Sequence, residues 1–439
     1  MLPSGLILRC TSWSSWSLRA LSTAAELKQK PDKVKRIERP KVFELDGRKF
    51  ETDDAWNLSP AVRRLLDRRL LSEESNPLNL LKRRIINYVH RTYRKSGNRS
   101  PIFTICENEP RVVTNFQNFD SLLTPADHVS RRPSDTYYVN ESHCLRAHTS
   151  AHQHSLMQSG LDAFLVIGDV YRRDEVDRTH YPCFHQELMG KKIADGENCE
   201  LFASNRQPRT ADKQEAHTID ATKALEIQLK QFLEQLCDEL FGRNCEKRWV
   251  DAYFPFTHPS YELEVFYNNQ WLEVLGCGIM EQKLLESAGV EEKVGWAFGI
   301  GLERIAMVLY GIPDIRLFWT RDSGFVSQFA GKSPEDAVTY KAISAHPQVI
   351  FDVSFFLPDQ VEFNDMTSDV YDTIRTVGGE LVEQVKLTDE FENKKKNKKS
   401  QTYRIVYRSH EKALTKEEVN VIHKRIEASL AENFNVTLR

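Results

Sequence analysis

The sequence predicts an α+β fold divided into at least two domains. Strand-like and helical stretches are interleaved irregularly from about residue 100 to residue 325, and a polar segment follows at 320–345. Beyond it, residues 346–439 alternate in the order β-α-β-β-α-β, which is typical of the ferredoxin-like fold. A chain of 439 residues has room for about two to four domains.

The composition is that of a globular protein. Hydrophobic residues make up 40% of the chain, aromatic residues 10% and charged residues 28%, which argues against wholesale disorder. The net charge is -3, so any nucleic-acid site has to be a local basic patch. No apolar run is long enough to predict a membrane span. The eight cysteines never form a CxxC pair, which argues against a disulfide scaffold or a zinc ribbon and favours a reducing compartment.

Residues 1–25 have the composition of a targeting segment. They contain Arg9, Arg19 and several serines but no Asp or Glu, and the first acidic residue is Glu26. An acid-free leader with Arg and Ser is typical of organelle transit peptides. We therefore expect a mitochondrial transit peptide at 1–25, with a plain disordered tail as the alternative, and a charged N-terminal extension at 26–60.

The elements between residues 59 and 325 follow from hydrophobic periodicity. Helices are expected to begin at Ser59-Pro60 and near Pro77, because proline is favourable in the first turn of a helix. Further along, the pattern predicts a buried strand at 164–168, an amphipathic helix at 221–240, strands at 261–265, 271–275 and 296–299, and a helix from near Gly301.

The elements of residues 346–439 are clearer. Strands are expected at 349–356, 385–391 and 402–409, with a short last strand at 436–438. Val370, Ile374, Val377 and Leu381 mark one face of the first helix. Thr415 and Glu418 have the spacing of a capping box, so the second helix is expected to begin there.

A basic segment occupies the middle of this C-terminal unit. Residues 391–410 hold a single acid, Glu392, and seven basic residues: Lys394, Lys395, Lys396, Lys398, Lys399, Arg404 and Arg408. Clustered positive charge is the electrostatic signature of RNA or DNA binding, and we favour contacts to a phosphate backbone. The alternative is a solvated lysine-rich loop.

Two arginine motifs suggest a nucleotide site. Arg172 follows the buried strand, and Phe184 comes after the polar loop that follows it. The guanidinium could bind phosphate while the ring stacks on a base. A surface arginine and a core phenylalanine would give the same pattern. Gly299-Ile-Gly301-Leu-Glu-Arg304 lacks the third glycine of a Rossmann fingerprint, but its arginine lies one turn into a helix. Two separated arginines suit ATP bound in a bent form.

Two further motifs suggest a small-molecule pocket. Phe254-Pro-Phe256 could form a rigid apolar slot for a ring, or simply pack in the core. His148 and His152 are at i, i+4 spacing and could hold zinc, with His154 nearby, but no HExxH glutamate is present. We expect no zinc and favour a polar site in which His148 and Ser150 bind a substrate amine or carboxylate.

Together these motifs resemble a known family. The ordered set comprises Arg172-x-Asp174, His180, Phe184-His-Gln186, Phe254-Pro-Phe256, Trp271-Leu-Glu-Val-Leu-Gly-Cys-Gly278 and Gly299-x-Gly-x-Glu-Arg304. With the ferredoxin-like C-terminal unit, it resembles the single-chain mitochondrial phenylalanyl-tRNA synthetases, which are class II aminoacyl-tRNA synthetases. The resemblance covers about residues 60–439. It implies a class II antiparallel-sheet catalytic domain flanked by helices at 61–325, a linker at 326–345 and a ferredoxin-like anticodon-binding domain at 346–439.

The resemblance also implies roles for individual residues. Arg172 and Arg304 are the expected catalytic residues, and ATP is expected to contact Arg172, His180, Phe184, Glu273 and Arg304, with Glu273 as a candidate Mg²⁺ ligand. Phenylalanine is expected to lie among His148, Ser150, Gln186, Phe254, Phe256 and Ala297. The implied reaction is ATP-dependent attachment of phenylalanine to tRNA(Phe) in the mitochondrial matrix, by a monomeric enzyme with no membrane partner.

One stretch departs from the family pattern. After Gln186 the chain continues as Glu187-Leu-Met-Gly-Lys-Lys-Ile, and no apolar strand is expected there. Compared with the family pattern, the sequence here is expected to be shortened by a deletion of about ten residues, roughly one strand and its turn. Loss of a central strand would leave the neighbouring backbone groups unpaired. The alternative function is therefore a catalytically impaired, synthetase-derived RNA-binding protein or splice form; a zinc hydrolase built on His148, His152 and His154 is a third hypothesis.

Overall fold

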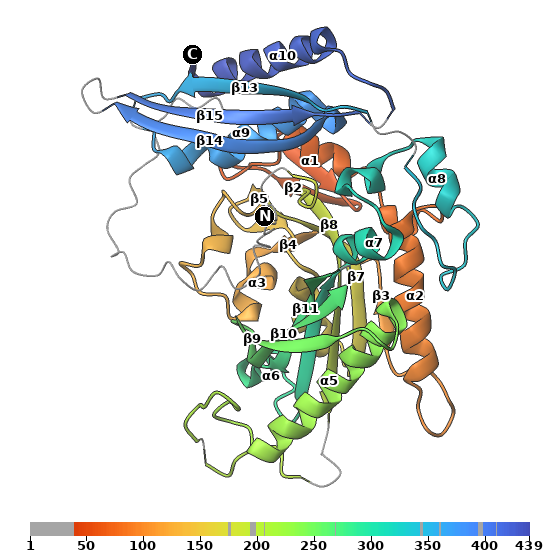
Figure 1. Cartoon of the computed structure of the whole chain (residues 1–439). Coiled ribbons are helices and arrows are strands. Elements are labelled where there is room, and N and C mark those ends of the chain that lie inside the picture. Colours follow the sequence, from red (N-terminus) through yellow and green to blue (C-terminus); the bar gives the residue numbers. More distant parts are fainter. Residues whose placement is uncertain are drawn as a thin grey trace, which may run out of the picture.

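The computed structural model describes residues 39–173, 177–193, 199–205, 207–267, 269–342, 346–359, 361–393, 398–409 and 411–439. It confirms the α+β prediction (Figure 1). A seven-stranded sheet has the order β3-β7-β8-β12-β11-β10-β9, and a separate four-stranded sheet has the order β14-β15-β13-β16. Smaller sheets pair β1 with β2, and β4 with β6 and β5. No described helix has the length and apolar character needed to cross a bilayer.

The seven-stranded sheet is antiparallel except for the pairing of β3 with β7. Its strands are β3 (Thr104–Cys106), β7 (Ala163–Tyr171), β8 (Cys183–Ile193), β9 (Lys247–Phe254), β10 (Thr257–Tyr267), β11 (Gln270–Met280) and β12 (Val294–Gly301). Three neighbouring strands form a small separate sheet: β4 (Val112–Thr114), β5 (Tyr138–Asn140) and β6 (His143–Leu145). The helices around them are α1 (Pro60–Leu65), α2 (Pro77–Thr92), α3 (Asn115–Asn118), α4 (Gln153–Gln158), α5 (Ile219–Phe241), α6 (Gln282–Ser287), α7 (Leu302–Tyr310) and α8 (Ser323–Phe329). Short 3-10 turns are η2 (Leu70–Ser72), η3 (Asp120–Leu122), η4 (Val129–Arg131), η5 (Thr149–His152) and η6 (Ile315–Trp319).

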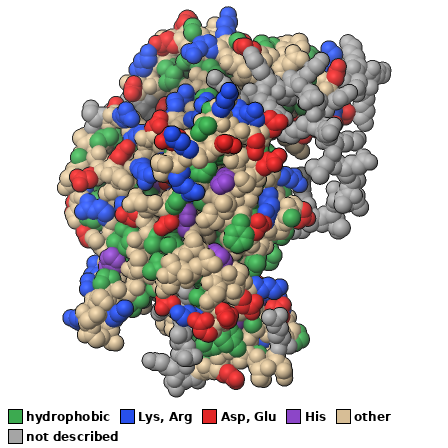
Figure 2. Space-filling view, turned by 180° about the vertical axis from the view of Figure 1, so that it is seen from behind, with side chains coloured by type: hydrophobic (Ala, Val, Ile, Leu, Met, Phe, Trp, Pro, Cys, Tyr) green, Lys and Arg blue, Asp and Glu red, His purple; other side chains and the backbone are tan. Residues whose placement is uncertain are grey.

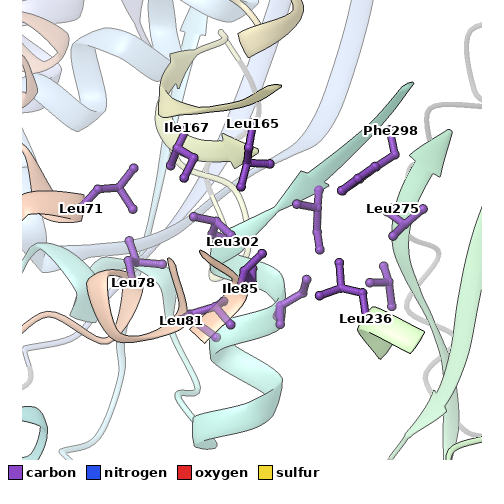
Figure 3. Close-up of a cluster of buried hydrophobic side chains, with 14 of the residues drawn as sticks. Leu71, Leu78, Leu81, Ile85, Leu165, Ile167, Leu236, Leu275, Phe298 and Leu302 are labelled. Atoms are coloured by element: carbon purple, nitrogen blue, oxygen red, sulfur yellow. The ribbon is translucent and has the colours of Figure 1, made fainter. Parts of the chain in front are cut away.

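One face of the large sheet is buried beneath helices. Side chains from α2, α5 and α7 meet alternate residues of β7, β11 and β12 in a continuous apolar cluster (Figure 3). Ile85 of α2, Leu236 of α5 and Phe298 of β12 are each at most 1% exposed. Burying a side chain of this size stabilises the fold by about 1.5–3 kcal/mol, so this cluster fixes the sheet and leaves its opposite face as the open one.

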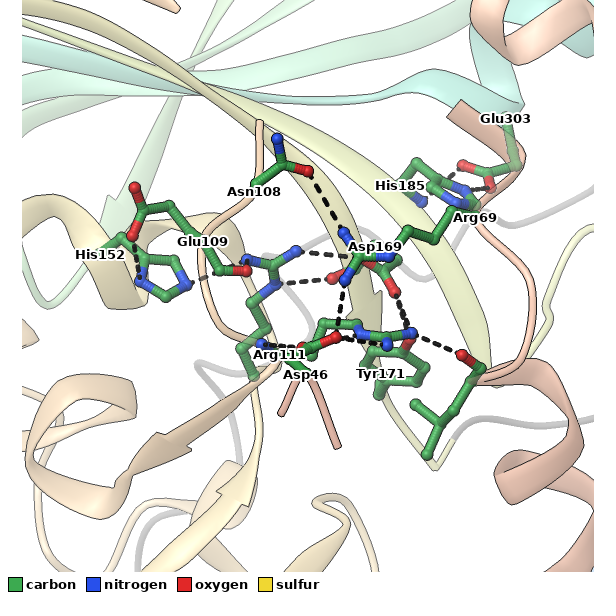
Figure 4. Close-up of polar contacts among 12 residues, drawn as sticks. Asp46, Arg69, Asn108, Glu109, Arg111, His152, Asp169, Tyr171, His185 and Glu303 are labelled. Carbon is green, nitrogen blue, oxygen red and sulfur yellow. Dashed lines mark hydrogen bonds and ion pairs between the residues drawn. The ribbon is translucent and has the colours of Figure 1, made fainter. Parts of the chain in front are cut away.

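An N-terminal hairpin is linked to the seven-stranded sheet through ion pairs. Its strands β1 (Val42–Leu45) and β2 (Arg48–Glu51) are joined by Asp46 and Gly47, whose φ angles of 52° and 72° suit the tight turn favoured between paired strands. The turn presents the Asp46 carboxylate to Arg111, at 2.6 Å from Nη2 and 3.1 Å from Nε (Figure 4). Arg111 in turn lies 3.6 Å from Asp169 of β7. The segment expected to be an N-terminal extension thus packs onto the core, because Phe43 and Phe50 are also buried there.

The C-terminal unit has the predicted ferredoxin-like order. It comprises β13 (Val349–Phe356), α9 (Phe363–Gly378), η7 (Gly379–Leu381), β14 (Val382–Asn393), β15 (Lys398–Tyr407), α10 (Lys416–Phe434) and β16 (Thr437–Leu438). The capping box at Thr415 and Glu418 forms as expected. Tyr403, Ile405 and Tyr407 are fully buried on one face of β15, in an apolar cluster separate from that of the large sheet.

The expectation that no strand follows Gln186 is wrong. β8 runs continuously from Cys183 to Ile193 and pairs with β7 on one side and β12 on the other. The two flanking strands each offer a row of backbone donors and acceptors, and pairing satisfies them whatever the polarity of the side chains between. Part of the segment expected to be a linker at 326–345 packs on the main core: α8 extends to the buried Phe329, and Val326, Val338 and Tyr340 are partly buried against the same cluster.

We expect Asp46→Asn to lower the free energy of unfolding by about 1.5–3 kcal/mol, since the change removes charge-assisted hydrogen bonds to the buried Arg111 and leaves the more distant Asp169 to balance its charge. Burial alone would raise the pKa of Asp46, but hydrogen bonds and the charge of Arg111 lower it to about 2. A carboxylate with a lowered pKa stabilises the fold above its ordinary value of 3.8, and this contribution disappears as the pH falls through about 2. The free energies of unfolding of the two proteins, measured in urea from pH 7 to pH 2, should therefore converge at low pH. Asp54→Asn, which breaks an exposed pair with Arg39, should cost at most about 1 kcal/mol.

Candidate active site

The open face of the large sheet has a floor of small residues. Strand pairing places Gly276 of β11 opposite Gly299 of β12, and Gly278 opposite Ala297. On the far side of β11, Gly278 pairs with Ser260 of β10. Residues that pair in this way share one face of the sheet, so these short side chains leave space above the strands. That space is where a ligand can lie against the sheet.

The two phenylalanines predicted to hold a ring lie over this floor. Phe254 and Phe256 are stacked with ring centroids 6.0 Å apart and planes 17° from parallel. A Cβ atom on Gly276 would meet the Phe254 ring at 2.7 Å, so the ring rests directly on the backbone of β11. Phe256 packs against an apolar cluster that includes Ala297, which is 2% exposed. The structure therefore brings Phe254, Phe256 and Ala297 together at one end of the open face.

Arg172 and Phe184 meet at the start of β8. The guanidinium carbon of Arg172 lies 5.0 Å from the centre of the Phe184 ring, and its Nε donates to the carbonyl oxygen of Ala147 at 2.8 Å. His148 follows Ala147 in the chain, and the Nδ1 atom of its ring is buried. Burial, and then the positive charge of Arg172, lower the pKa of His148 to about 3, so the imidazole is neutral near pH 7. Ser150 is buried one turn further on, in η5.

Gln186 and His180 take different places. Gln186 lies in β8 opposite Gly168 of β7 and Gly301 of β12, on the same face as the small-residue floor; its side chain is outside the described part of the structure. His180 instead turns toward Asp177, with Nδ1 at 2.7 Å from a carboxylate oxygen. His180 and Asp177 both line a cavity, and residues of the C-terminal domain, including Glu380, form its other wall.

Acidic side chains gather where β10 and β11 face α7. Arg304 lies 3.6 Å from Glu273, and Glu264 pairs across the strands with Glu273. Burial, and then the charges of Glu273 and Glu264, raise the pKa of Glu262 to about 7, and its Oε1 has no hydrogen-bond partner among the described residues. Burial likewise raises the pKa of Glu273, with Arg304 acting in the opposite direction. An unsatisfied buried carboxylate beside an arginine indicates a position for a cationic or hydrogen-bonding ligand.

A buried pair ties the two arginine motifs together. His185 of β8 directs Nδ1 to Glu303 at 2.6 Å, and its backbone amide donates to the same carboxylate at 2.9 Å. These two residues neighbour Phe184 and Arg304 in the chain. The pair therefore fixes the distance between the strand that carries Phe184 and the helix that carries Arg304.

The basic residues of the C-terminal domain do not form one free patch. Lys394, Lys395 and Lys396 lie outside the described residues. Lys398 is exposed, whereas Lys399 pairs with Glu362 at 2.5 Å and Arg404 makes a bidentate pair with Asp352 at 2.8 Å. Arg408 departs most from the expectation, because its Nε lies 2.9 Å from the buried Glu383 at the domain boundary. Figure 2 likewise shows basic and acidic side chains interspersed over the face it displays.

The histidine-rich segment does not converge on a metal. His152 contacts Arg146 at 3.0 Å, and His154 contacts the carbonyl oxygen of Ser287 at 3.0 Å, so the two rings have different partners. Within the described ranges, no three His, Cys, Asp or Glu side chains are placed to hold a metal ion.

Several buried polar residues beside the open face were not among the predicted site residues. Asn118 accepts a hydrogen bond from the amide of Ala147, next to His148, and its Nδ2 is buried without a partner among the described residues. Gln153 and Glu262 likewise bury an oxygen that has no partner in the described structure. For Glu262 a signal existed, because a charged residue at a position of β10 flanked by Tyr261 and Leu263 interrupts an otherwise buried strand. Nothing local marks Asn118 or Gln153.

Two family models match this chain. The family described as tRNA synthetases class II core domain (F) matches residues 77–190 and 214–329, and the ferredoxin-fold anticodon binding domain matches residues 344–439. The first match leaves out residues 191–213, which begin within the stretch from Glu187 to Ile193 where the sequence departs from the family pattern.

Full-length relatives are similar over nearly the whole chain. The mitochondrial phenylalanine–tRNA ligase of Mus musculus is 45% identical over 437 residues, covering 98% of this chain and 94% of that protein. The probable mitochondrial phenylalanine–tRNA ligase of Drosophila melanogaster is 44% identical over 459 residues, covering 99% and 100%. The chloroplastic/mitochondrial phenylalanine–tRNA ligase of Arabidopsis thaliana is 44% identical over 389 residues, covering 89% and 84%. The chain therefore belongs to the family of mitochondrial phenylalanine–tRNA ligases and combines a class II synthetase core with a C-terminal ferredoxin-fold anticodon-binding domain.

Proposed function

We propose that this protein attaches phenylalanine to tRNA(Phe) in the mitochondrial matrix, through a phenylalanyl-adenylate intermediate. The stacked Phe254 and Phe256 rings above the small-residue floor carry the proposal, because they offer a phenyl side chain two aromatic surfaces. From Gly190, opposite Ala297, to Gln186 the strand β8 covers about 13 Å. That span exceeds the length of a phenylalanine molecule, so the face has room for the ring over Ala297 and for the α-phosphate of ATP toward Arg172.

The residues support a division of labour between the two substrates. His148, Ser150 and Gln186 would hold the ammonium and carboxylate groups of phenylalanine. Phe184 would stack on adenine, and His180 would reach the β- and γ-phosphates. Because His148 is neutral, it can hydrogen-bond an ammonium group without repelling it.

The reaction needs no nucleophile from the protein. A carboxylate oxygen of phenylalanine attacks the α-phosphorus of ATP, and the bond to the bridging oxygen of pyrophosphate breaks. The terminal ribose hydroxyl of the tRNA then attacks the acyl carbon, and AMP leaves. Arg172 and Arg304 would stabilise the charge that develops on the phosphoryl oxygens, so catalysis consists of positioning and electrostatic stabilisation.

The acidic residues fit a divalent cation shared with ATP. Glu262 and Glu273 supply hard oxygen atoms, and the partnerless Oε1 of Glu262 is free for a ligand within the described structure. Mg²⁺ commonly takes one or two carboxylates and completes its shell with phosphate oxygens and water. When bound, it would neutralise charge on the phosphates of ATP. Glu262 and Glu273 would hold it, and Arg304 would remain available to the phosphates.

The alternative of a catalytically impaired RNA-binding protein has no observation in its favour. It rested on the loss of a central strand, and β8 occupies that position. Phenylalanine-dependent exchange between ATP and pyrophosphate tests the enzymatic reading directly. Robust exchange by the chain from Glu26 onward would support it, and a folded protein without exchange would contradict it.

Arg172→Ala should reduce phenylalanine-dependent pyrophosphate exchange by about 10²- to 10³-fold or more, because it removes a preorganised cation at the α-phosphate. Binding of tRNA(Phe), measured by filter retention, should stay within error of the unchanged protein. Equal exchange rates for the two proteins would show that Arg172 does not contact ATP.

Ala297→Gly should let the pocket accept para-substituted phenylalanines. Removing one methyl group beneath the slot changes discrimination between substrates by roughly 1–3 kcal/mol. The ratio of kcat/KM for para-chlorophenylalanine to that for phenylalanine should therefore rise by about tenfold or more in pyrophosphate exchange. A flat substrate profile would place Ala297 away from the ring.

Replacing Lys394, Lys395, Lys396, Lys398 and Lys399 by glutamine should weaken tRNA binding and flatten its dependence on salt. Each lost phosphate contact lowers the slope of log K against log salt by about 0.7–0.9. Binding measured from 50 to 200 mM KCl tests this expectation. An unchanged slope would identify the lysines as a solvated loop.

A further inference from the structure

The segment that joins β7 to β8 carries Arg172 and His180, both assigned above to ATP. Each is followed directly in the chain by a residue that the C-terminal domain holds. Arg173 follows Arg172 and is bound by α9, while Tyr181 follows His180 and is bound by Glu380 of η7. Within one segment, Arg172 and His180 are thus assigned to ATP, and the residue after each of them contacts the C-terminal domain.

Arg173 anchors the first end of the segment. Its Nη2 lies 2.9 Å from Asp372 and 2.5 Å from Asp369, and its Nε donates to Asp372 at 3.2 Å. Tyr137 donates to the other oxygen of Asp372 at 3.2 Å. The side chains of Arg173 and Asp372 are only 3% and 4% exposed, so this pair is shielded from water, whereas Asp369 is 31% exposed. Charge-assisted hydrogen bonds in a buried setting hold their partners in one geometry.

Arg178 and Tyr181 anchor the second end. Arg178 pairs with Glu383 of β14, and the hydroxyl of Tyr181 donates to Glu380 at 2.9 Å. Glu383 is 1% exposed and is also approached by Arg408 at 2.9 Å and Gln348 at 2.6 Å. Gln348 donates to the same oxygen of Glu383 as Arg178 does, and Arg408 approaches the other oxygen as an ion pair without hydrogen-bond geometry. Glu383 therefore offers Arg178 a buried carboxylate that is held from more than one side.

We propose that the C-terminal domain positions the ATP-binding segment of the catalytic domain, with Asp372, Glu380 and Glu383 as positioning residues for adenylate formation. Each of these carboxylates contacts a side chain of the segment. They act through Arg173, Tyr181 and Arg178, which restrict the backbone on either side of the segment and so set the directions of Arg172 and His180. The anticodon-binding domain thereby contributes to the first half-reaction, which requires no tRNA.

The inference rests on the proposed function for its kinetic consequence. If the contacts hold the segment in its ATP-binding arrangement, breaking one lowers the fraction of protein in that arrangement. The apparent affinity for ATP falls by the same factor. Phenylalanine, which the rings of Phe254 and Phe256 hold, should bind as before.

Arg178→Gln and Tyr181→Phe test this with little risk to the fold. The Arg178 side chain is 46% exposed, and Tyr181→Phe keeps the ring that packs against Trp319. In pyrophosphate exchange without tRNA, each variant should raise the KM for ATP roughly threefold to tenfold, while kcat and the KM for phenylalanine stay within about twofold. Arg178→Lys, which keeps the charge, should restore most of the affinity.

Ser368→Ala is the matched control. It removes a hydrogen bond across the same boundary, from the Ser368 hydroxyl of α9 to the carbonyl oxygen of Ser134 at 3.0 Å, and neither residue belongs to the segment. Its KM for ATP should not change. An unchanged KM in the folded Arg178→Gln and Tyr181→Phe proteins would overturn the proposal, as would an equal rise in Ser368→Ala.

A failure of the proposed function is distinguishable from a failure of this inference. If the unchanged protein shows no phenylalanine-dependent exchange, the same variants are compared by equilibrium dialysis with ATP. A weaker Kd for ATP in Arg178→Gln and Tyr181→Phe, but not in Ser368→Ala, would still support the positioning role. Equal Kd values in all four proteins would overturn it.

Discussion

The site depends on a sheet that is packed on one face and kept open on the other. Seven strands satisfy one another's backbone groups, and the helices α2, α5 and α7 bury the side chains of one face. The opposite face can therefore carry glycine at 276, 278 and 299 without loss of cohesion, since the ladder and the far-side core hold the strands. Small residues in a strand weaken it, so they persist where a ligand or a ring needs the space.

Rigid attachments on two sides complete the site. The hairpin turn places Asp46 against Arg111, which reaches Asp169 in the strand that leads to Arg172 (Figure 4). On the other side, α9 holds Arg173, which follows Arg172. Both attachments are charged and buried, so each specifies a single geometry better than apolar packing would. Arg172 thus lies between two fixed points that belong to different parts of the chain.

Local signals in the sequence predicted local structure well. The capping box at Thr415, the strand at 349–356 and the buried alternation of Tyr403, Ile405 and Tyr407 all depend on residues within a few positions of one another. The motifs also placed Phe254, Phe256 and Ala297 together, through the resemblance to a known family. Long-range partners were beyond the sequence, because Arg111 pairs with a residue 65 positions away and Arg408 with the buried Glu383. The strand after Gln186 was missed for a related reason: its polar residues gave no strand signal, whereas the neighbouring strands required a partner.

The boundary between the two domains differs in kind from either core. The apolar cluster of the large sheet and that of the C-terminal domain are separate, and the contacts between them are dominated by ion pairs from Arg173, Arg178 and Arg316 to acidic residues of α9 and β14. Apolar contact is insensitive to direction, whereas a bidentate ion pair is lost after a small shift of the two domains. The contacts of a charged boundary are therefore either all formed or broken. Such a boundary couples the docking of the C-terminal domain to the arrangement of the segment that bears Arg172 and His180. A purely apolar boundary of the same size would hold the domains together but would leave that segment free to adopt several conformations.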